Sequence, residues 1–267
     1  MSFLDNTAEA PTILDVQHVT MRFGGITAVN DLSMRFPKGS ITGLIGPNGA
    51  GKTTVFNVIS GFYTPQEGSI IFKGKDVKGF QPHRICRAGM ARTFQNIRLF
   101  GSETAVENVM VGCHVRRKSQ WWMPMLSLPW AIREEREMRE RATELIHKLS
   151  LDSYIHEKAS SLPYGAQRRL EIARALATQP DFLLLDEPAA GMNPQESTEL
   201  MHFIEHIRDE FDLTILLIEH DMKVVMGVCQ YIWVLEYGQL IAEGEPDVIQ
   251  NDPKVIEAYL GEDVHHA

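Results

Sequence analysis

Apolar and polar residues alternate in the first part of the chain. Together with β-branched residues and breaks at Gly and Pro, this alternation predicts strands at residues 13–20, 28–36 and 69–72. A short apolar run at residues 41–45 ends in a glycine and is followed by a predicted helix at residues 52–60. A strand, a glycine loop and a helix in this order begin an α/β unit.

The later part of the chain combines buried-strand patterns with helical ones. Apolar runs without alternation at residues 182–185 and 214–218 are typical of strands in a parallel sheet covered on both faces. Two further segments at residues 231–235 and 239–243 flank a glycine and predict a hairpin. Helices are expected at residues 166–177, 199–209 and 133–149, the last on an apolar series with helical spacing: Met138, Ala142, Leu145, Ile146 and Leu149. This alternation of strands and helices predicts an α/β fold.

Composition narrows the classes of protein that this chain can be. The 267 residues are 44% hydrophobic and 23% charged, which is ordinary for a soluble globular protein. A formal net charge of −9 argues against binding to nucleic acid through bulk charge. The uncharged stretch at residues 121–132 is too short for a membrane span, which needs about 20 apolar residues, so a role at a membrane requires a separate spanning partner. Three scattered cysteines favour a reducing compartment.

One loop carries a phosphate-binding pattern, GxxxxGK[ST]. It consists of Gly46, Pro47, Asn48, Gly49, Ala50, Gly51, Lys52 and Thr53. Its glycines let successive N–H groups point at phosphate oxygens, and the helix N-terminus that follows favours an anion. Lys52 adds a charge between the β- and γ-phosphates, and the Thr53 hydroxyl suits Mg²⁺. The sequence therefore predicts a site for ATP with Mg²⁺.

Two adjacent carboxylates close the apolar strand at residues 182–185. Because a parallel sheet places the carboxyl ends of its strands at the ligand crevice, Asp186 can reach the shell of the Mg²⁺ ion. Glu187, one residue further on, can orient and deprotonate an attacking water. A general base of this kind contributes roughly 10²–10⁴ in rate. The pair predicts hydrolysis of the bound nucleotide.

Several short motifs accompany the phosphate loop in a fixed order. They are Gln95 within residues 92–96, the segment LPYGAQRRL at residues 162–170, Asp186 with Glu187, Ala190-Gly191-Met192-Asn193, and His220 after the last buried strand. On this set the chain resembles the ABC ATPase family from residue 13 to about residue 260. The resemblance implies a P-loop NTPase core of the RecA-like type, an antiparallel β subdomain and an α-helical subdomain at about residues 97–170, with tails at residues 1–12 and 261–267.

The resemblance also implies roles for single residues. Gln95 matches the Q-loop glutamine, which touches Mg²⁺ and water and signals to the transporter. His220 matches the switch histidine near the γ-phosphate, and Phe23 lies where an aromatic ring stacks on adenine. Taken alone, these three residues are a surface amide, a structural histidine and a half-buried strand aromatic. The implied nucleotide contacts are Phe23, Val29, the phosphate loop, Thr54, Gln95 and Asp186; the implied catalytic residues are Lys52, Gln95, Glu187 and His220; the implied metal ligands are Thr53, Gln95 and Asp186.

The segment at residues 162–166 departs from the family's LSGGQ signature, which caps the γ-phosphate held by a second subunit. Pro163 replaces the serine, Tyr164 the first glycine and Ala166 the glutamine, while Gly165 is retained. Pro163 supplies no hydroxyl, but the helix that begins near Gly165 still offers N–H groups and a positive dipole end. Asn193 replaces an aspartate at the dimer seam. These changes suggest that the two sites of a dimer need not be equivalent.

Within the family, the chain is similar to the ATP-binding subunits of branched-chain amino acid importers. The similarity lies in residues 23–29, 163–165, 187–194, 218–222 and 258–261. It implies a peripheral ATP hydrolase at the cytoplasmic face of the inner membrane. The implied partners are a second ABC ATPase, identical or different, two multi-spanning permeases and, indirectly, an extracytoplasmic substrate-binding protein. Urea importers and the lipopolysaccharide-export ATPase share several of these features and remain alternatives.

Other interpretations have less support. A soluble P-loop kinase leaves the signature and His220 unexplained, and a non-transport ABC protein usually carries coiled-coil arms or tandem cassettes. Ile97, Leu99 and Phe100 are expected in the groove for a permease's coupling helix, or in ordinary packing. A cluster of apolar residues is expected either to face a partner or to pack locally. It consists of Trp121, Trp122, Met123, Met125, Leu126 and Trp130.

Overall fold

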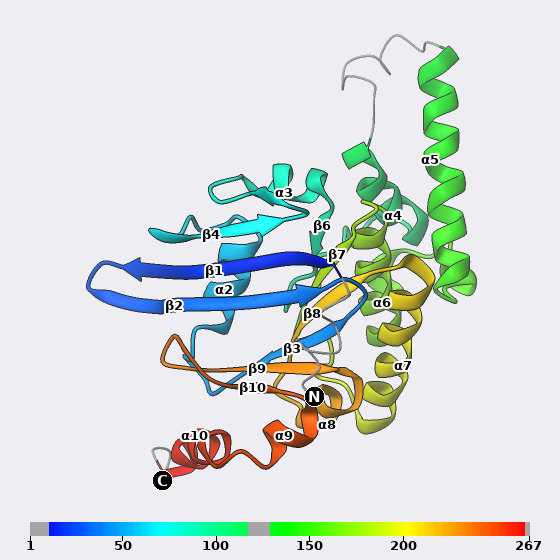
Figure 1. The fold of residues 1–267 in the computed structure, drawn as a ribbon. Coiled ribbons are helices and arrows are strands. Elements are labelled where there is room, and N and C mark those ends of the chain that lie inside the picture. The colour runs from blue at the N-terminus through cyan, green and yellow to red at the C-terminus, as the bar shows by residue number, and fades with distance from the viewer. Residues whose placement is uncertain (1–10, 117–128, 265–267) are drawn as a thin grey trace. The chain divides into compact units, whose positions relative to one another are not determined.

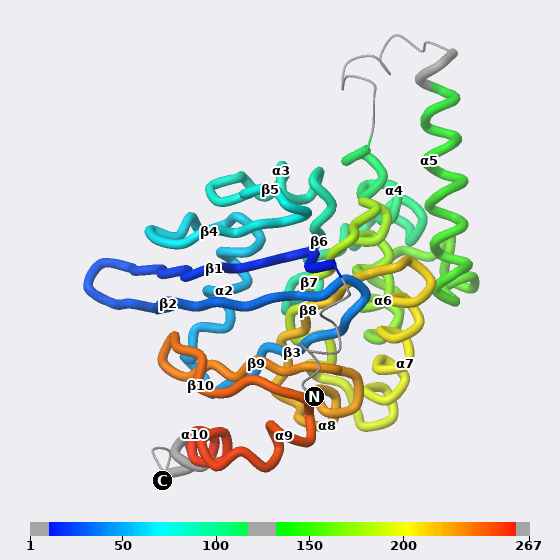
Figure 2. The backbone as a smooth tube through the Cα atoms, in the orientation of Figure 1, coloured from blue at the N-terminus to red at the C-terminus, as the bar shows by residue number. Residues whose placement is uncertain are grey.

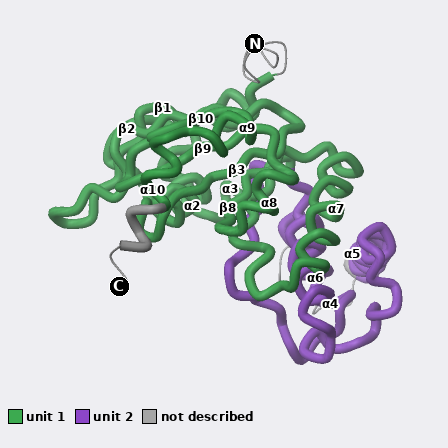
Figure 3. Tube along the Cα trace, turned by 90° about the horizontal axis from the view of Figure 1, so that it is seen from below, with its two compact units in different colours: residues 1–85, 181–267 green, residues 86–180 purple. Residues whose placement is uncertain are grey.

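The computed structural model of the chain describes residues 11–116 and 129–264, the backbone alone for residues 129–131 and 260–264 (Figures 1 and 2). The chain folds into two compact units, Met1–Ile85 with Asp181–Ala267, and Cys86–Pro180 (Figure 3). The first unit combines two parts of the chain that are far apart in the sequence. The tryptophan-rich patch expected near residue 121 lies outside the residues whose side chains are described.

An antiparallel sheet occupies the first part of the first unit, in the order β2-β1-β4-β5. Its strands are β1 (Thr12–Phe23), β2 (Ile26–Pro37), β4 (Glu67–Phe72) and β5 (Lys75–Asp76). Leu14 of β1 pairs with Phe36 on one side and Phe72 on the other, and all three are buried. The strands expected from alternation are thus confirmed, because alternation places one face of each strand in the core.

Three short strands that are buried throughout run parallel to one another within a second sheet. They are β3 (Ile41–Ile45), β7 (Phe182–Asp186) and β8 (Thr214–Ile218). Strand β8 lies between the other two, and Ile218 pairs with Leu44 of β3 and with Asp186 of β7. These three strands therefore end at the same edge of the sheet. Strand β9 (Tyr231–Glu236) adds on parallel to β3, and β10 (Gln239–Gly244) follows as the antiparallel partner of the predicted hairpin.

Capping residues set the start of the longest helix described in the first unit. Helix α7 (Pro194–Phe211) starts five residues before the expected position, because Asn193 and Glu196 form a capping box and Pro194 fits the first turn. Its buried positions, Leu200, Ile204 and Ile207, repeat at helical spacing. The other helices that lie within this unit are α2 (Lys52–Ile59), α8 (Met222–Val228), α9 (Pro246–Gln250) and α10 (Pro253–Val264). Helix α10 continues four residues past the expected end of the domain.

The second unit is mainly helical and consists of Cys86–Pro180, compared with the expected 97–170. Helix α5 (Pro129–Lys148) buries Met138, Ala142 and Ile146 on one face, as its spacing predicts. Helix α4 (Ala105–Cys113) packs against α5 and α6 (Tyr164–Leu176). A Cβ atom at Gly112 would lie 2.2 Å from the Arg174 carbonyl oxygen, so glycine allows this close approach. The remaining elements are β6 (Met90–Arg92) and short 3₁₀ turns; α3 (Pro82–Ala88) joins the two units along the chain.

No helix in the described part of the chain combines the length and apolarity that crossing a bilayer requires.

Candidate functional site

The phosphate loop joins the end of β3 to the start of α2 and has a backbone that only glycine can adopt at two of its positions. Gly46 and Gly51 have φ angles of 146° and 104°. A Cβ atom would lie 2.0 Å from the Leu235 carbonyl oxygen at Gly46, and 2.6 Å from that of Ala28 at Gly51. Gly51 is the N-cap of α2 and provides no side-chain cap, so the first turn keeps N–H groups for an anion.

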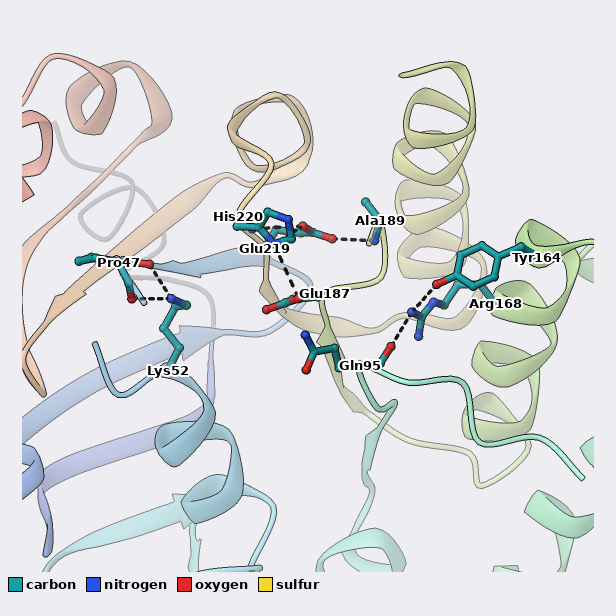
Figure 4. A network of polar contacts seen from close by, with 10 residues as sticks. Pro47, Lys52, Gln95, Tyr164, Arg168, Glu187, Ala189, Glu219 and His220 are labelled. Atoms are coloured by element: carbon teal, nitrogen blue, oxygen red, sulfur yellow. Dashed lines mark hydrogen bonds and ion pairs between the residues drawn. The ribbon is translucent and has the colours of Figure 1, made fainter. Parts of the chain in front are cut away.

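Lys52 lies over this loop. Its Nζ atom donates hydrogen bonds to the carbonyl oxygens of Gly46 and Pro47 at 2.5 and 2.8 Å (Figure 4). The ammonium group is therefore held beside the N–H groups that a phosphate would contact. The Gly46 N–H donates to the hydroxyl of Tyr259 at 2.9 Å, so helix α10 supports the start of the loop. The sequence pattern placed Tyr259 only in the importer-like segment at residues 258–261 and predicted no contact with this loop, because its partner is distant in the chain.

Asp186 and Glu187 follow β7 at the edge where β3 also ends. Asp186 is only 6% exposed. Glu187 has a φ angle of 45°, in the left-handed region that costs a side-chain-bearing residue about 1–2 kcal/mol. Its N–H donates to the Ile218 carbonyl oxygen at 2.9 Å, which fixes the residue to the end of β8. Backbone strain of this kind clusters at functional sites.

His220 follows β8 by two residues, and its Nδ1 atom is 3.7 Å from Oε2 of Glu187 (Figure 4). The predicted base and the predicted switch histidine are thus neighbours within one unit. The His220 side chain is two-thirds exposed and that of Glu187 about one-quarter. Both can therefore meet a ligand that lies over the carboxyl ends of β7 and β8.

Glu219 is a buried carboxylate that sequence reasoning passed over. It is 1% exposed, its Oε1 atom accepts a hydrogen bond from the Ala189 N–H at 2.6 Å, and its Oε2 atom accepts one from the His220 N–H at 3.2 Å. Burial raises the pKa of this carboxyl above its ordinary value, against the opposing effect of its backbone donors. The sequence signal that could have identified Glu219 is its place, as a charged residue, between an apolar strand and a candidate histidine.

Aromatic rings accompany the phosphate loop in the same unit. Phe23 is 41% exposed, and its ring meets the exposed ring of Tyr63 edge to face, with centroids 5.1 Å apart. Tyr63 was not expected from the sequence. Val29, by contrast, is fully buried, with a methyl group 3.7 Å from the Cβ position of Gly51, so it packs behind the loop. The exposed pair offers π faces, whereas Val29 supports the backbone. Thr54 lies in the first turn of α2, next to Thr53.

The second unit carries Gln95 and the signature segment. Helix α6 begins at Tyr164, two residues before the helix expected at residues 166–177, and its N-cap Pro163 makes no side-chain cap. Gln95 and Tyr164 are exposed, while Gly165 and Ala166 are partly exposed. The open first turn of this helix can accept an anion from a second molecule.

A buried ion pair on α6 holds the backbone around Gln95. Arg168 donates to the carbonyl oxygen of Gln95 at 2.8 Å (Figure 4). It also donates to that of Phe94 at 2.8 Å and pairs with Glu171 at 2.9 Å. Glu171 accepts in turn from the Arg98 N–H at 3.2 Å. Both charged side chains are almost fully buried. Two opposite charges at i and i+3 on the apolar face of a predicted helix were a signal that the sequence contained.

We expect Arg168→Leu to lower the free energy of unfolding by about 3–5 kcal/mol, because it leaves the Glu171 charge buried without its partner. Replacing both residues by Leu should cost less than the single change, because no unpaired charge stays buried and the remaining cost comes from the backbone groups that lose these side chains. The matched control is Arg133→Ala, whose ion pair with Glu137 is exposed and contributes at most about 0.5 kcal/mol. Urea unfolding of the three variants measures this, and equal losses in Arg168→Leu and Arg133→Ala would contradict the assignment.

Comparison with known proteins agrees with this geometry. A family model described as ABC transporter matches residues 29–190, and one described as Branched-chain amino acid ATP-binding cassette transporter matches residues 239–265. The chain is 46% identical to the high-affinity branched-chain amino acid transport ATP-binding proteins BraF of Pseudomonas aeruginosa and LivG of Escherichia coli. In both cases the similarity extends over 250 residues, which are 94% of this chain and 98% of the relative.

A solved structure of the same kind is the ADP conformation of an ATP-binding cassette of an ABC transporter. It has a TM-score of 0.83 and 33% sequence identity, and the match covers 94% of this chain and 99% of that one. The resemblance and the fold class predicted from the motifs are thereby confirmed. The chain belongs to the ABC transporter family and is one of its ATP-binding cassettes.

Proposed function

We propose that this chain binds and hydrolyses ATP to drive an ABC transporter that imports branched-chain amino acids. The observation that carries the ATPase activity is that the phosphate loop, Glu187 and His220 all follow strands that end at one edge of the sheet. The substrate class is supported by the names of the 46% identical relatives and by the family match at residues 239–265. That match favours amino acids over urea or lipopolysaccharide.

The first unit provides the contacts that ATP needs. The N–H groups of the phosphate loop and the Lys52 ammonium bind the phosphates, with Asn48 and Thr54 at the rim of the loop. The exposed ring of Phe23, together with Tyr63, stacks on the adenine. Val29 keeps the loop in place from behind.

The residues for a magnesium site are oxygen donors. Thr53 offers an exposed hydroxyl in the first turn of α2, and Asp186 a carboxylate at the end of β7, which are the hard ligands that Mg²⁺ prefers. Gln95 of the second unit is the third proposed ligand. When bound, Mg²⁺ neutralises negative charge on the phosphate oxygens.

Hydrolysis depends on two side chains at the sheet edge. Glu187 takes the proton of the attacking water, and its left-handed backbone and the bond to Ile218 hold it at the end of β7. His220, 3.7 Å from Glu187, contacts the γ-phosphate from the end of β8. Lys52 stabilises the charge on the transferred group.

Two cassettes sandwich the nucleotides between them. The open first turn of α6, at Tyr164, Gly165 and Ala166, approaches the γ-phosphate bound by the second cassette, with Pro163 as the N-cap. Asn193 caps α7 at the seam of this dimer. Phosphate release removes the charge that bridges the seam, so the dimer opens. The second cassette is an identical chain or a paralogue. With a paralogue, the two sites of the dimer differ in their contribution, whereas two identical chains form two equal sites.

The permeases bind the second unit at the cytoplasmic face of the membrane. Phe100 is half exposed beside the Arg174 guanidinium, which is 5.9 Å from the ring centroid, and Ile97 and Leu99 are partly exposed. These side chains line the groove for the coupling helix. Substrate reaches the permeases through an extracytoplasmic binding protein, which this chain does not touch.

A pull-down from membranes of the native cell, in mild detergent, tests the assembly. Two multi-spanning proteins and a second ATPase are expected, and cells that lack this chain should lose most uptake of labelled leucine. Uptake should return with the wild-type chain and not with Glu187→Gln. Recovery of export components, or leucine uptake that persists without the chain, would remove the importer assignment and leave the ATPase chemistry to be judged on its own.

A further inference from the structure

Glu219 lies directly after β8, between the strand and the switch histidine His220, and its carboxylate faces two different loops. The Ala189 N–H, in the loop that follows Glu187, donates to Oε1 at 2.6 Å. The His220 N–H donates to Oε2 at 3.2 Å, and Nδ1 of His220 is 3.9 Å from the same oxygen. One side chain thus connects the loop of the base with the loop of the histidine (Figure 4).

Burying the Glu219 carboxylate costs free energy unless the group is hydrogen-bonded. The residue is 1% exposed, and a buried carboxylate is tolerated only when it is paired or hydrogen-bonded. Here the donors are backbone N–H groups of the two loops that carry the proposed chemistry. A neutral apolar residue would fill the same volume without linking these loops. The arrangement therefore indicates that the carboxylate holds the two loops in position relative to each other.

Backbone hydrogen bonds hold the chain on both sides of Glu187, and Glu219 accepts one of them. On one side, the Glu187 N–H donates to the Ile218 carbonyl oxygen, directly before Glu219. On the other side, Ala189, two residues after Glu187, donates to the Glu219 carboxylate. The backbone at the base is therefore tied to residues 218–219 both before and after its own Cα atom. Two hydrogen bonds therefore connect the loop of Glu187 to residues 218–219.

We propose that Glu219 is a positioning residue, whose buried carboxylate locks the loop of Glu187 to the loop of His220 so that both side chains meet the same γ-phosphate. This inference rests on the proposed hydrolysis of ATP and deepens it. Glu219 contacts neither the nucleotide nor the water, and it acts through the two residues that do. Its loss should affect turnover far more than ATP binding, because the phosphate loop is fixed by other contacts.

The test is the isosteric change Glu219→Gln in the full chain, measured by steady-state hydrolysis over a range of ATP concentrations and by titration with ATP. The amide keeps one acceptor oxygen but sets an NH₂ group against a backbone N–H. We expect kcat to fall about ten- to a hundredfold, and KM and Kd for ATP to stay within about twofold, as a loss confined to the transition state requires. Glu107→Gln is the matched control, since Glu107 accepts the Thr104 N–H in the capping box of α4 and should leave kcat unchanged.

A double-variant cycle separates positioning from general loss of structure. In a His220→Ala background, Glu219→Gln should lower kcat by a smaller factor than it does in the wild-type chain, because one of the two residues that Glu219 positions is gone while the contact with the Glu187 loop is still lost. If the two changes multiply, or if Glu219→Gln alone hydrolyses ATP like the wild type, the inference is wrong. Should Glu219→Gln fail to fold, Glu219→Asp keeps the charge but is one methylene too short to reach both loops, and the same loss of kcat at unchanged KM is expected.

The outcome for Glu187→Gln in the same assay keeps the two proposals apart. If that variant loses turnover while Glu219→Gln retains it, only the inference about Glu219 fails. If the wild-type chain and Glu187→Gln hydrolyse ATP equally, the proposed hydrolytic site itself fails.

Discussion

Glu187→Gln is expected to bind ATP as tightly as the wild-type chain and to hydrolyse it about 10²–10⁴ times more slowly. The amide has nearly the shape of the carboxylate but cannot accept the proton of the attacking water. The position of residue 187 is fixed by its backbone, through its left-handed φ angle and its hydrogen bond to Ile218, so the change alters chemistry rather than placement. The negative charge beside the γ-phosphate is also removed, so affinity for ATP should not fall.

Binding and turnover must be measured separately for this variant. Calorimetric titration with ATP gives the affinity, and single-turnover release of phosphate gives the rate. Glu199→Gln, an exposed carboxylate on α7, is the control and should match the wild type in both. Hydrolysis at the wild-type rate in Glu187→Gln would overturn the assignment of the base, while a loss of ATP binding would show that the carboxylate supports the site instead.

The sequence predicts best the strands and the glycine loop of this site, because both depend on residues that are adjacent in the chain. The runs at residues 41–45 and 214–218 became buried strands at those positions, because a short apolar segment with few polar groups must be covered on both faces. The loop after Gly46 follows from its glycines, which leave the backbone few alternatives. Because β8 lies between β3 and β7, the motifs that follow these strands come together.

What the sequence does not predict depends on contacts between distant segments. The Tyr259 hydroxyl meets Gly46 only because the C-terminal helix returns to the phosphate loop. Glu219 follows an apolar strand and has the appearance of a surface carboxylate until the Ala189 N–H is found beside it. Arg168 likewise reads as a surface charge in the sequence, but in the structure it is buried and donates to the carbonyl oxygens of Phe94 and Gln95. Each of these side chains hydrogen-bonds to backbone atoms far along the chain, and periodicity and composition do not record such contacts.

Lys52→Ala is expected to weaken ATP binding by about ten- to a hundredfold, as the loss of a charged hydrogen-bond donor worth about 1.5–3 kcal/mol implies. In the structure the ammonium group donates to the carbonyl oxygens of Gly46 and Pro47, so it is held beside the phosphate loop. The loop itself should persist in the variant, because its turns are set by glycine and its start is held by Tyr259.

A comparison of nucleotides makes this prediction specific to the phosphate contacts. Because Lys52 acts on the β- and γ-phosphates, affinity for ATP should fall strongly, whereas AMP, bound through the adenine and one phosphate, should bind the variant and the wild type within about twofold. Lys223→Ala, an exposed lysine at the start of α8, is the control and should leave both affinities unchanged. An equal loss for AMP and ATP would mean that Lys52 maintains the fold of the loop, and an unchanged affinity for ATP would mean that the ammonium group stays on the carbonyl oxygens when the nucleotide binds.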